Sequence, residues 1–280
     1  MKVLVTGANG YLGSGVVKQL CDDGIDVIAT DLKADHIDRR SIWYKADLYE
    51  LDNPYEYFGQ PDVIFHMAWR NGFIHNDPSH VMDLPKHYLF LKKMIDGGVK
   101  RVAVMGSMHE IGFFEGSIKA DTPTHPENLY GISKNALRNI TESLCRNAFV
   151  QYQWLRGYYI VGNSEFGCSV FSKIAAAEKE RKNLFPFTTG VNQYDFIDYS
   201  DFCFQAASII EQDKICGIIN ICSGRPEKLS DRVERFIKER NYNIKLDYGK
   251  LPDRTYDSKA VWGDSSIVER IINMRTQNEK

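Results

Sequence analysis

Short apolar runs alternate with longer amphipathic stretches along the first two thirds of the chain. The apolar runs, rich in Val, Ile and Leu, predict strands at Lys2–Thr6, Asp26–Thr30, Val63–His66, Val102–Gly106 and Gln151–Arg156. The stretches between them carry helical periodicity at Gly13–Asp23, Leu84–Gly97 and Tyr130–Asn147. Strands separated by helices of this length predict parallel β-α-β units with right-handed crossovers. Nearly continuous apolar strands indicate that helices cover both faces of the sheet.

The pattern changes after about Gly162. One helix is predicted at Phe171–Arg181, and the run Ile215–Ile221 predicts a further buried strand. A helix at Ser230–Arg240, a strand around Ile244–Tyr248 and a final helix complete the chain. We therefore expect an α/β protein with a dinucleotide-binding domain over residues 1–162, to which residues 193–222 return, and a small C-terminal substrate-binding lobe formed by residues 163–192 and 223–280.

A glycine-rich turn follows the first predicted strand, in the run Thr6-Gly7-Ala8-Asn9-Gly10-Tyr11-Leu12-Gly13. In such a strand–turn–helix unit Gly7 permits the tight turn, Gly10 lets a pyrophosphate approach the backbone, and Gly13 lets the helix pack closely on the strand. Free N–H groups at the start of the helix then bind the phosphates. The spacing is G-x-x-G-x-x-G rather than G-x-G-x-x-G, but its place at the first strand–helix junction favours a Rossmann-type, doubly wound sheet.

An acidic residue at the end of the second strand indicates which dinucleotide binds. Asp31 lies 18 residues past Gly13, where its carboxylate can accept hydrogen bonds from the adenosine ribose hydroxyls and would repel a 2′-phosphate. NAD is therefore favoured over NADP as the cofactor. Three cationic side chains nearby would soften that preference: Lys33, Arg39 and Arg40. Asp47 and Leu48, after a third short strand, form a candidate adenine contact.

Tyr130 and Lys134 stand four residues apart in a predicted helix, so that both side chains lie on one face. An unperturbed Tyr titrates near pH ~10. A neighbouring ammonium favours the phenolate and brings the phenol into a useful range for moving a proton. Ser107 ends the strand that begins at Arg101, where ligands bind in open α/β sheets, and its hydroxyl can hydrogen-bond the same substrate oxygen.

Taken in order, these motifs resemble the extended short-chain dehydrogenase/reductase family, and specifically its branch of nucleotide-sugar epimerases, dehydratases and reductases. The resemblance rests on the glycine-rich turn, Asp31, His66-Met67-Ala68 after the fourth strand, Ser107 and the Tyr130–Lys134 pair. It continues through three later segments and so covers nearly the whole chain: Trp154–Gly162, Tyr194–Asp201 (similar to R-D-F-I-x-V-x-D), and Arg254–Asp257 with Trp262–Ser265.

The resemblance implies an NAD-dependent enzyme that acts on a nucleotide-diphosphate sugar. Tyr130 would move the proton, Lys134 would hold the nicotinamide ribose and lower the pKa of Tyr130, Ser107 would orient the sugar oxygen, and His109 would shuttle protons. The implied cofactor contacts are Gly7, Asn9, Gly10, Tyr11, Leu12, Gly13, Asp31, Leu32, Asp47, Leu48, His66, Ala68, Tyr130 and Lys134. The implied substrate contacts are Ser107, Met108, His109, Tyr159, Tyr194 and Arg254, the last on the pyrophosphate.

Departures from the family's pattern bear on the reaction. Dehydratases carry an Asp-Glu pair directly after the catalytic hydroxyl residue, and this chain has Met108 and His109 there, so 4,6-dehydration is not expected. In the GDP-fucose synthase branch the position of His109 holds a Cys that helps to epimerise a 4-keto sugar. His109 either shares such a duty or only supports the substrate. Tyr194 stands where the family often has Arg, and Tyr159 where it often has Asn.

Two interpretations of the activity remain. The first, which we favour, is a reductase of a nucleotide-linked 4-keto-6-deoxyhexose that makes a sugar such as fucose or talose; the shortened chain favours it. The second is a 4-epimerase, which recycles its NAD, and Asp31 favours it. A non-catalytic NAD sensor is disfavoured because Tyr130 and Lys134 are both retained. By resemblance, Leu84–Gly97 and Tyr130–Asn147 would pair with their copies in a homodimer.

Composition limits the partners and the location. A net charge of −2 favours neither nucleic acid nor an anionic membrane. No apolar stretch reaches the ~20 residues that a membrane span needs, and no signal peptide is evident. The six cysteines form no C-x-x-C pair and read as reduced core thiols, so a cytoplasmic location is expected. The seven histidines match no common zinc motif, and no metal is expected.

Overall fold

Seven parallel strands form the main sheet in the order β11-β7-β5-β4-β1-β2-β3. The computed structural model describes residues 1–162, 169–253 and 257–278. The chain runs outward from β1 to β3 and then returns to build the other half, so the strand order reverses between β1 and β4. Ligands bind outside the carboxyl ends of the strands at such a point. The strands are β1 (Lys2–Thr6), β2 (Asp26–Asp31), β3 (Ile42–Lys45), β4 (Val63–His66), β5 (Arg101–Ser107), β7 (Gln151–Gly157) and β11 (Gly217–Ile221).

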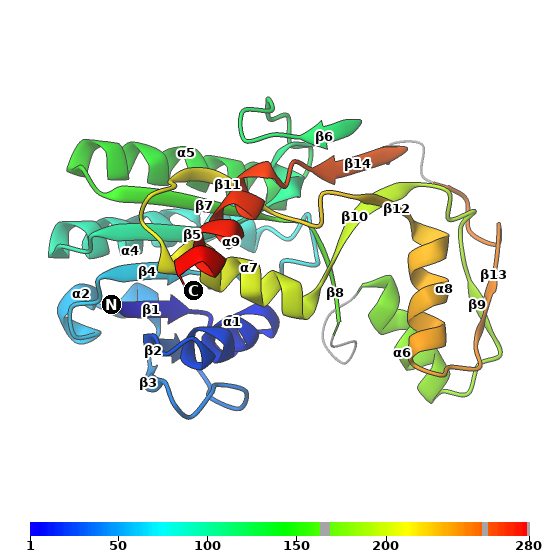
Figure 1. Ribbon diagram of the computed structural model, residues 1–280, viewed down its shortest axis with the longest axis horizontal. Coiled ribbons are helices and arrows are strands. Elements are labelled where there is room, and N and C mark those ends of the chain that lie inside the picture. The colour runs from blue at the N-terminus through cyan, green and yellow to red at the C-terminus, as the bar shows by residue number, and fades with distance from the viewer. Residues whose placement is uncertain (163–168, 254–256, 279–280) are drawn as a thin grey trace.

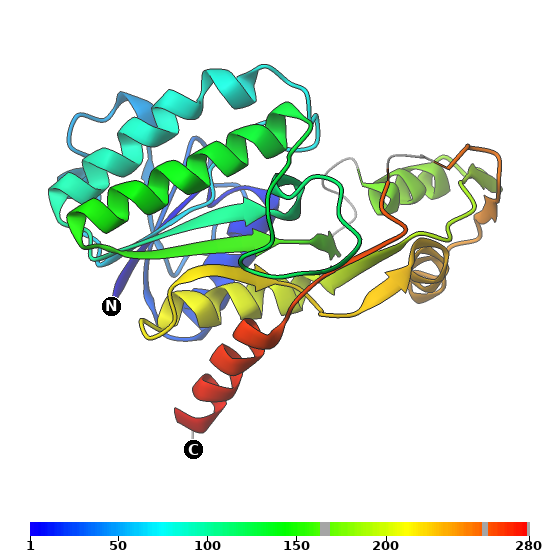
Figure 2. The same ribbon diagram turned by 90° about the horizontal axis from the view of Figure 1, so that it is seen from above.

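Helices cover both faces of this sheet, as the continuous apolar strands predict. One face carries α1 (Tyr11–Asp22), α7 (Tyr199–Glu211) and α9 (Ser266–Asn278). The other face carries α4 (Leu84–Gly97) and α5 (Leu129–Ala148), with the short α2 (Pro54–Tyr57) and α3 (Ser79–Met82) beside them. Figure 2 shows α4 and α5 on one side of the strands and α7 and α9 on the other. The predicted Rossmann-type α/β fold is confirmed.

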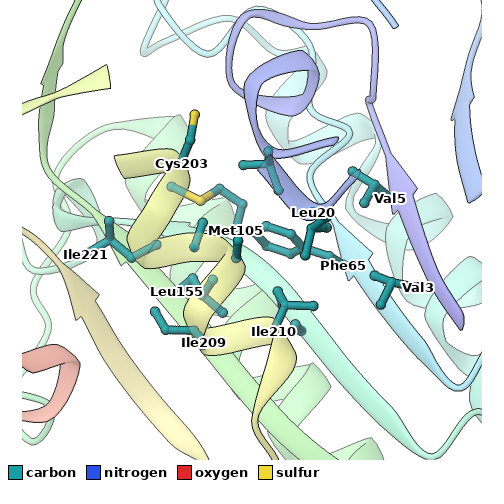
Figure 3. Close-up of a cluster of buried hydrophobic side chains, with 14 of the residues drawn as sticks. Val3, Val5, Leu20, Phe65, Met105, Leu155, Cys203, Ile209, Ile210 and Ile221 are labelled. Atoms are coloured by element: carbon teal, nitrogen blue, oxygen red, sulfur yellow. The ribbon is translucent and has the colours of Figure 1, made fainter. Parts of the chain in front are cut away.

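The larger apolar core lies between the sheet and the helices α1 and α7. Side chains from β1, β4, β5 and β7 meet side chains from α7 in Figure 3, where Val3, Phe65 and Leu155 face Ile209 and Ile210. All five are fully buried. Burial of each such side chain stabilises the fold by about 1.5–3 kcal/mol, so this face depends on α7 as much as on the strands.

A second layer of strands leads from the main sheet into the lobe. β10 (Gln193–Asp198) pairs with three strands at once: β8 (Tyr159–Val161), β12 (Pro226–Lys228) and β14 (Ala260–Gly263). β6 (Gly116–Ile118) pairs with β14. The lobe itself consists of α6 (Val170–Lys179) and α8 (Leu229–Glu239), with the strand pair β9 (Leu184–Pro186) and β13 (Lys245–Asp247). It lies beyond the carboxyl ends of the main strands (Figure 1).

The carboxylate of Asp195 joins three separate segments of this second layer. Its two oxygens accept hydrogen bonds from the backbone N–H groups of Ser223, Gly224 and Gly263 and from the Ser223 hydroxyl, at 2.7–3.0 Å. Asp195 is fully buried, and burial raises the pKa of its carboxyl. The segment 193–222 is thus divided between the two layers. Helix α7 packs on the main sheet and β11 is one of its strands, whereas β10 belongs to the layer that leads to the lobe.

Candidate active site

The glycine-rich turn brings the backbones of two strand ends into contact. Gly7 has φ +66°, and a Cβ there would lie 2.8 Å from the Cα of Ala68, just past β4. A Cβ at Gly13 would lie 2.1 Å from the carbonyl oxygen of Gly7, so α1 packs directly on the turn. Gly10 stands at the N-cap of α1, and within the described residues no side chain caps this helix. The first turn of α1 is therefore built to present N–H groups to an anion.

Asp31 holds the neighbouring edge of this turn. Its carboxylate accepts hydrogen bonds from the N–H of Asn9 at 3.0 Å and from the N–H of Leu32 at 2.7 Å. The Asn9 side chain in turn accepts from the N–H of His36 at 2.7 Å. Tyr11 stacks on Tyr199, with ring centroids 4.8 Å apart. The glycines leave a space at the turn that Cβ atoms would fill, and the Asp31 carboxylate is held next to it. This arrangement suits a dinucleotide whose ribose hydroxyls bind Asp31.

Asp47 and Leu48 lie at the start of the short helix η1 (Leu48–Glu50), after β3. The Asp47 side chain accepts a hydrogen bond from the N–H of Tyr49 at 3.1 Å, which caps the helix, while Leu48 is buried. Both follow the strand next to β2, on the same side of the turn as Asp31. Their predicted contact with adenine stays a prediction.

His66 lies beneath the site in a buried chain of hydrogen bonds. Thr6 Oγ1 accepts from the N–H groups of Met67 and Ala68 and lies 2.8 Å from His66 Nδ1. Its own proton is therefore directed to Nδ1, so that His66 Nε2–H donates to His87 Nδ1, 2.8 Å away. Both ring nitrogens are engaged within the protein. The geometry therefore gives the His66 side chain a supporting position under the turn rather than an open face.

Ser107, Tyr130 and Lys134 meet where β5 ends and α5 begins. Ser107 lies close enough to Tyr130 to lower the pKa of its phenol. Lys134 Nζ donates to the carbonyl oxygen of Met105 at 2.8 Å and lies 5.9 Å from the centre of the Tyr130 ring. Burial raises the pKa of Tyr130 to about 12, and Ser107 opposes that rise. Burial lowers the pKa of Lys134 to about 7.

These pKa directions differ from one expectation of the sequence. Lys134 was expected to lower the pKa of Tyr130, but desolvation of the phenol is the larger effect and Lys134 does not offset it. Tyr130 is consequently protonated at neutral pH. In this state the phenol is a proton donor, which suits the addition of a proton to a carbonyl oxygen.

Four rings surround Tyr130. His75 stacks on it at 5.6 Å between centroids, and the rings of Trp69, His80 and His109 approach at 5.3–6.0 Å. The loop after β4 supplies the first two, and its His75 carbonyl accepts from the N–H of Tyr130 at 2.8 Å. None of the motifs in the sequence includes Trp69, His75 or His80. Their places follow from tertiary contact, which no sequence motif announces.

His109 and Met108 occupy the short helix η2 (Met108–Glu110). The N–H of His109 donates to Ser107 Oγ at 3.3 Å, and its ring lies 4.4 Å from that of His75. Burial, reinforced by His75, lowers the pKa of His109 to about 4, so the imidazole is neutral at pH 7. Met108 is buried in an apolar cluster that also holds Ile118 and Tyr194, and its predicted contact with substrate stays a prediction.

Tyr159 and Tyr194 continue this row of rings toward the lobe. The Tyr159 ring lies 6.4 Å from His109 and 4.9 Å from Tyr194. The Tyr194 hydroxyl accepts from the Asn192 amide at 3.3 Å and donates to Asp257 at 3.4 Å. A small pocket lies nearby, lined by Tyr11, Phe73, Ile160, Gly162, Ser169, Phe171 and Ser172. The predicted pyrophosphate ligand Arg254 lies outside the described residues.

A buried ion cluster stands directly behind the site. The Glu110 carboxylate accepts from Trp154 Nε1 and Arg156 Nε, both at 2.9 Å, and its second oxygen lies 3.6 Å from Arg138 Nε. Glu110 and Arg156 are fully buried. Glu110 also favours the charged form of Lys134 and so raises its pKa, against the effect of burial.

Comparison with known proteins identifies the family. The model of the NAD dependent epimerase/dehydratase family matches residues 3–222. The chain belongs to this family. The expected relationship to the extended short-chain dehydrogenase/reductases, and to an enzyme family, is therefore confirmed.

Curated relatives of this family member include sugar-nucleotide enzymes. A dTDP-6-deoxy-L-talose 4-dehydrogenase (NAD(+)) of Aggregatibacter actinomycetemcomitans is 42% identical over 270 residues, which cover 94% of this chain and 99% of the relative. A UDP-glucose 4-epimerase of Lactobacillus helveticus is 29% identical over 182 residues, covering 60% of this chain and 54% of the relative. Full-length similarity to the first is therefore much stronger.

Solved structures share the fold. The UDP-glucose 4-epimerase of Thermotoga maritima with UDP-glucose superposes with a TM-score of 0.82 at 21% identity, covering 96% of this chain and 92% of that one. The dTDP-glucose 4,6-dehydratase DesIV of Streptomyces venezuelae gives 0.80 at 18% identity, covering 96% and 90%.

Two kinds of feature are absent from the described residues. None of the helices there combines the length and apolar character that crossing a membrane requires. Nor do three His, Cys, Asp or Glu side chains gather there as ligands for a metal ion.

Proposed function

We propose that this protein is an NAD(H)-dependent oxidoreductase that acts at C4 of a nucleotide-linked 6-deoxyhexose. The observation that carries the proposal is the meeting of Ser107, Tyr130 and Lys134 beside the glycine-rich turn. The relative from A. actinomycetemcomitans supports the choice of substrate, since a 4-dehydrogenase of dTDP-6-deoxy-L-talose interconverts a C4 hydroxyl and a 4-ketone. In the reductive direction the substrate is a 4-keto-6-deoxy sugar attached to dTDP.

The cofactor fits the turn described above. Gly7, Gly10 and Gly13 leave space for the pyrophosphate, and Asp31 favours the unphosphorylated ribose of NAD over NADP. When bound, NAD(H) supplies the hydride for reduction or accepts it in oxidation. Lys134, with its ammonium beside the Tyr130 ring, is placed to hold the nicotinamide ribose.

The protein's own groups handle the proton. In reduction, the neutral Tyr130 phenol donates its proton to the C4 oxygen as negative charge develops there. The Ser107 hydroxyl, which lies beside Tyr130, orients the same oxygen. Ser107, which lowers the pKa of Tyr130, also stabilises the phenolate that remains. His109, neutral at pH 7, is proposed to contact the sugar from η2 and to shuttle protons.

The proposal is tested by turnover of two substrates with stoichiometric cofactor change. The purified full chain is given dTDP-6-deoxy-L-talose with NAD⁺, or a dTDP-4-keto-6-deoxyhexose with NADH, and NADH absorbance is followed. We expect one NADH formed or consumed per sugar. Conversion of a nucleotide sugar into its 4-epimer with no net change in NADH would overturn the proposal in favour of a 4-epimerase.

Tyr130→Phe tests the proton donor. We expect kcat to fall by about 10²–10⁴-fold, because the ring remains but the proton is lost, while NADH binding by fluorescence is unchanged. The matched control is Tyr57→Phe, a hydroxyl deletion at an exposed position on α2 that should leave kcat unchanged. Full activity of Tyr130→Phe would remove the phenol from the mechanism.

We also propose that the protein is a homodimer through α4 and α5. These helices present apolar side chains outward: Leu89 is 52% exposed and Ile132 is 43% exposed. We expect sedimentation of the full chain as a dimer and of Leu89→Lys as a monomer, because the charge would be buried at the interface. Leu184→Lys, at an exposed position on β9, is the control. A wild-type monomer at micromolar concentration would refute the proposal.

A further inference from the structure

The ammonium of Lys134 lies over the face of an indole ring. Its Nζ is 3.9 Å from the centre of the Trp69 ring, well within the range of a cation–π contact. A second contact is the hydrogen bond to the carbonyl oxygen of Met105. Lys134 is only 3% exposed, so neither contact is exchanged freely for water. An ammonium in this position is held in place by these two groups.

Trp69 is itself held firmly. Its indole Nε1–H donates to His80 Nδ1 at 3.0 Å, which orients the ring within its plane. The His87 ring stacks on the indole at 4.6 Å with an interplanar angle of 12°. His87 belongs to the buried chain with His66 and Thr6, which supports the turn beneath the cofactor site. The indole is therefore a fixed surface rather than a mobile cover.

The charge on Lys134 is finely balanced. Burial opposes the ammonium and Glu110 favours it, which leaves a pKa of about 7. At neutral pH a modest additional stabilisation of the cation decides whether it stays protonated, and the negative face of an indole provides one. The charged and titratable groups that face Lys134 are Tyr130 on α5, Glu110 on η2, His66 on β4 and His87 on α4. Glu110 is in turn paired with Arg138 on α5 and Arg156 on β7, and Trp69 is hydrogen-bonded to His80 on α3.

We propose that Trp69 is a positioning residue whose π-face holds the Lys134 ammonium, charged and in place, beside Tyr130. The inference rests on the proposed function for its effect on turnover, but the contact itself does not. One N–H of the ammonium donates to Met105, and the ammonium lies over the indole. Loss of the π-face would weaken the cation beside Tyr130.

Graded weakening of the π-face provides the test. Trp69 is replaced site-specifically by tryptophans that carry one to four fluorine atoms on the ring. Each fluorine reduces the negative electrostatic potential of the ring face with little change in ring shape. We expect log kcat of NADH-driven reduction to fall in step with fluorine number. Trp69→Leu should lose about 10- to 30-fold, as for a desolvated cation–π contact, and Trp69→Phe should recover part of that loss. The same fluorinated residues at Trp43, 43% exposed on β3, are the control and should leave kcat unchanged.

A second measurement needs no substrate. In protein labelled with [¹³Cε]lysine, the Lys134 signal is identified as the one missing from Lys134→Arg, and its pKa is followed by NMR titration. We expect this pKa to fall progressively across the fluorinated series. An unchanged pKa, or a kcat that depends only on side-chain size, would overturn the role of Trp69. Absence of turnover in the wild-type protein would defeat the proposed function instead and leave the titration as the test of the contact.

Discussion

Replacement of Glu110 by Gln isolates the buried charge behind the active site. The two side chains have nearly the same shape, and the amide oxygen of Gln can still accept from Trp154 Nε1. The change therefore leaves packing and one hydrogen bond in place while it removes the negative charge next to Arg156. Arg156 is fully buried, so water cannot replace the lost partner.

The cost follows from that burial. Removing one partner of a buried ion pair costs about 3–5 kcal/mol, because the other charge is left uncompensated. Arg138 lies 3.6 Å away on the same carboxylate and is left with the same deficit. Since the Gln amide keeps part of the hydrogen bonding, we expect the lower end, a loss of ~3 kcal/mol in the free energy of unfolding. That is a large share of the ~5–15 kcal/mol that stabilises a typical protein.

Urea unfolding followed by circular dichroism measures this loss. The control, Glu142→Gln, removes an exposed carboxylate from α5 and should change the unfolding free energy by less than about 0.5 kcal/mol. Adding Arg156→Met to Glu110→Gln should restore part of the stability, because the unpaired charge is then gone. A loss below ~1 kcal/mol for Glu110→Gln alone would refute the account of Glu110 as a necessary counter-ion.

Two further predictions concern the buried histidines and the glycine-rich turn. Burial lowers the pKa of His87 to about 3 in the folded state. Between pH ~3 and ~6.5 only the unfolded chain therefore binds a proton at this residue. The free energy of unfolding is at its full value above pH ~6.5 and is lower by about 2 kcal/mol at pH ~5. Burial lowers the pKa of His66 as well, so His66 adds to this effect. His87→Asn should reduce the dependence of the unfolding free energy on pH, measured by urea unfolding. The same pH dependence in the variant and in the wild type would contradict this prediction. Gly13→Ala places a Cβ 2.1 Å from the Gly7 carbonyl oxygen and should raise the dissociation constant of NADH more than tenfold. In the control Gly72→Ala the new Cβ would have only contacts of 3.8 Å or longer, and this variant should bind NADH as the wild type does. Equal NADH affinities of the two variants would contradict the assignment of the glycine-rich turn as the cofactor site.

The regular part of the fold was predictable because its periodicity is strong. The strand Val63–His66 and the helix Leu84–Gly97 have the predicted bounds, and β1 does also. Helix α7 was not predicted. Its buried residues Phe202, Cys203, Ala206, Ala207 and Ile210 nevertheless follow the three- and four-residue spacing of an amphipathic helix. The pattern was therefore present in the sequence and was missed.

The candidate site was predictable only where a motif carries it. Ser107, Tyr130 and Lys134 were found from their places at a strand end and one helix turn apart, and the structure brings them together. Trp69, in the loop after β4, and His80, on the four-residue helix α3, could not be found in this way, since segments this short or irregular show no period and their side chains reach Tyr130 only after folding. The balance of charge on Lys134 likewise depends on burial, which sequence spacing does not reveal.

The place of α7 and β11 has a consequence for any attempt to divide the molecule. A fragment ending at residue 162 would contain the cofactor turn and the Ser–Tyr–Lys set, and by sequence alone it looks like a complete unit. It would nevertheless lack the last strand of the main sheet and the helix that covers Val3, Phe65 and Leu155 (Figure 3). Those side chains would then face water, and the fragment would aggregate rather than fold. Nucleotide-binding and sugar-binding parts must therefore be exchanged between relatives by replacing internal loops, because the chain offers no single point at which to cut.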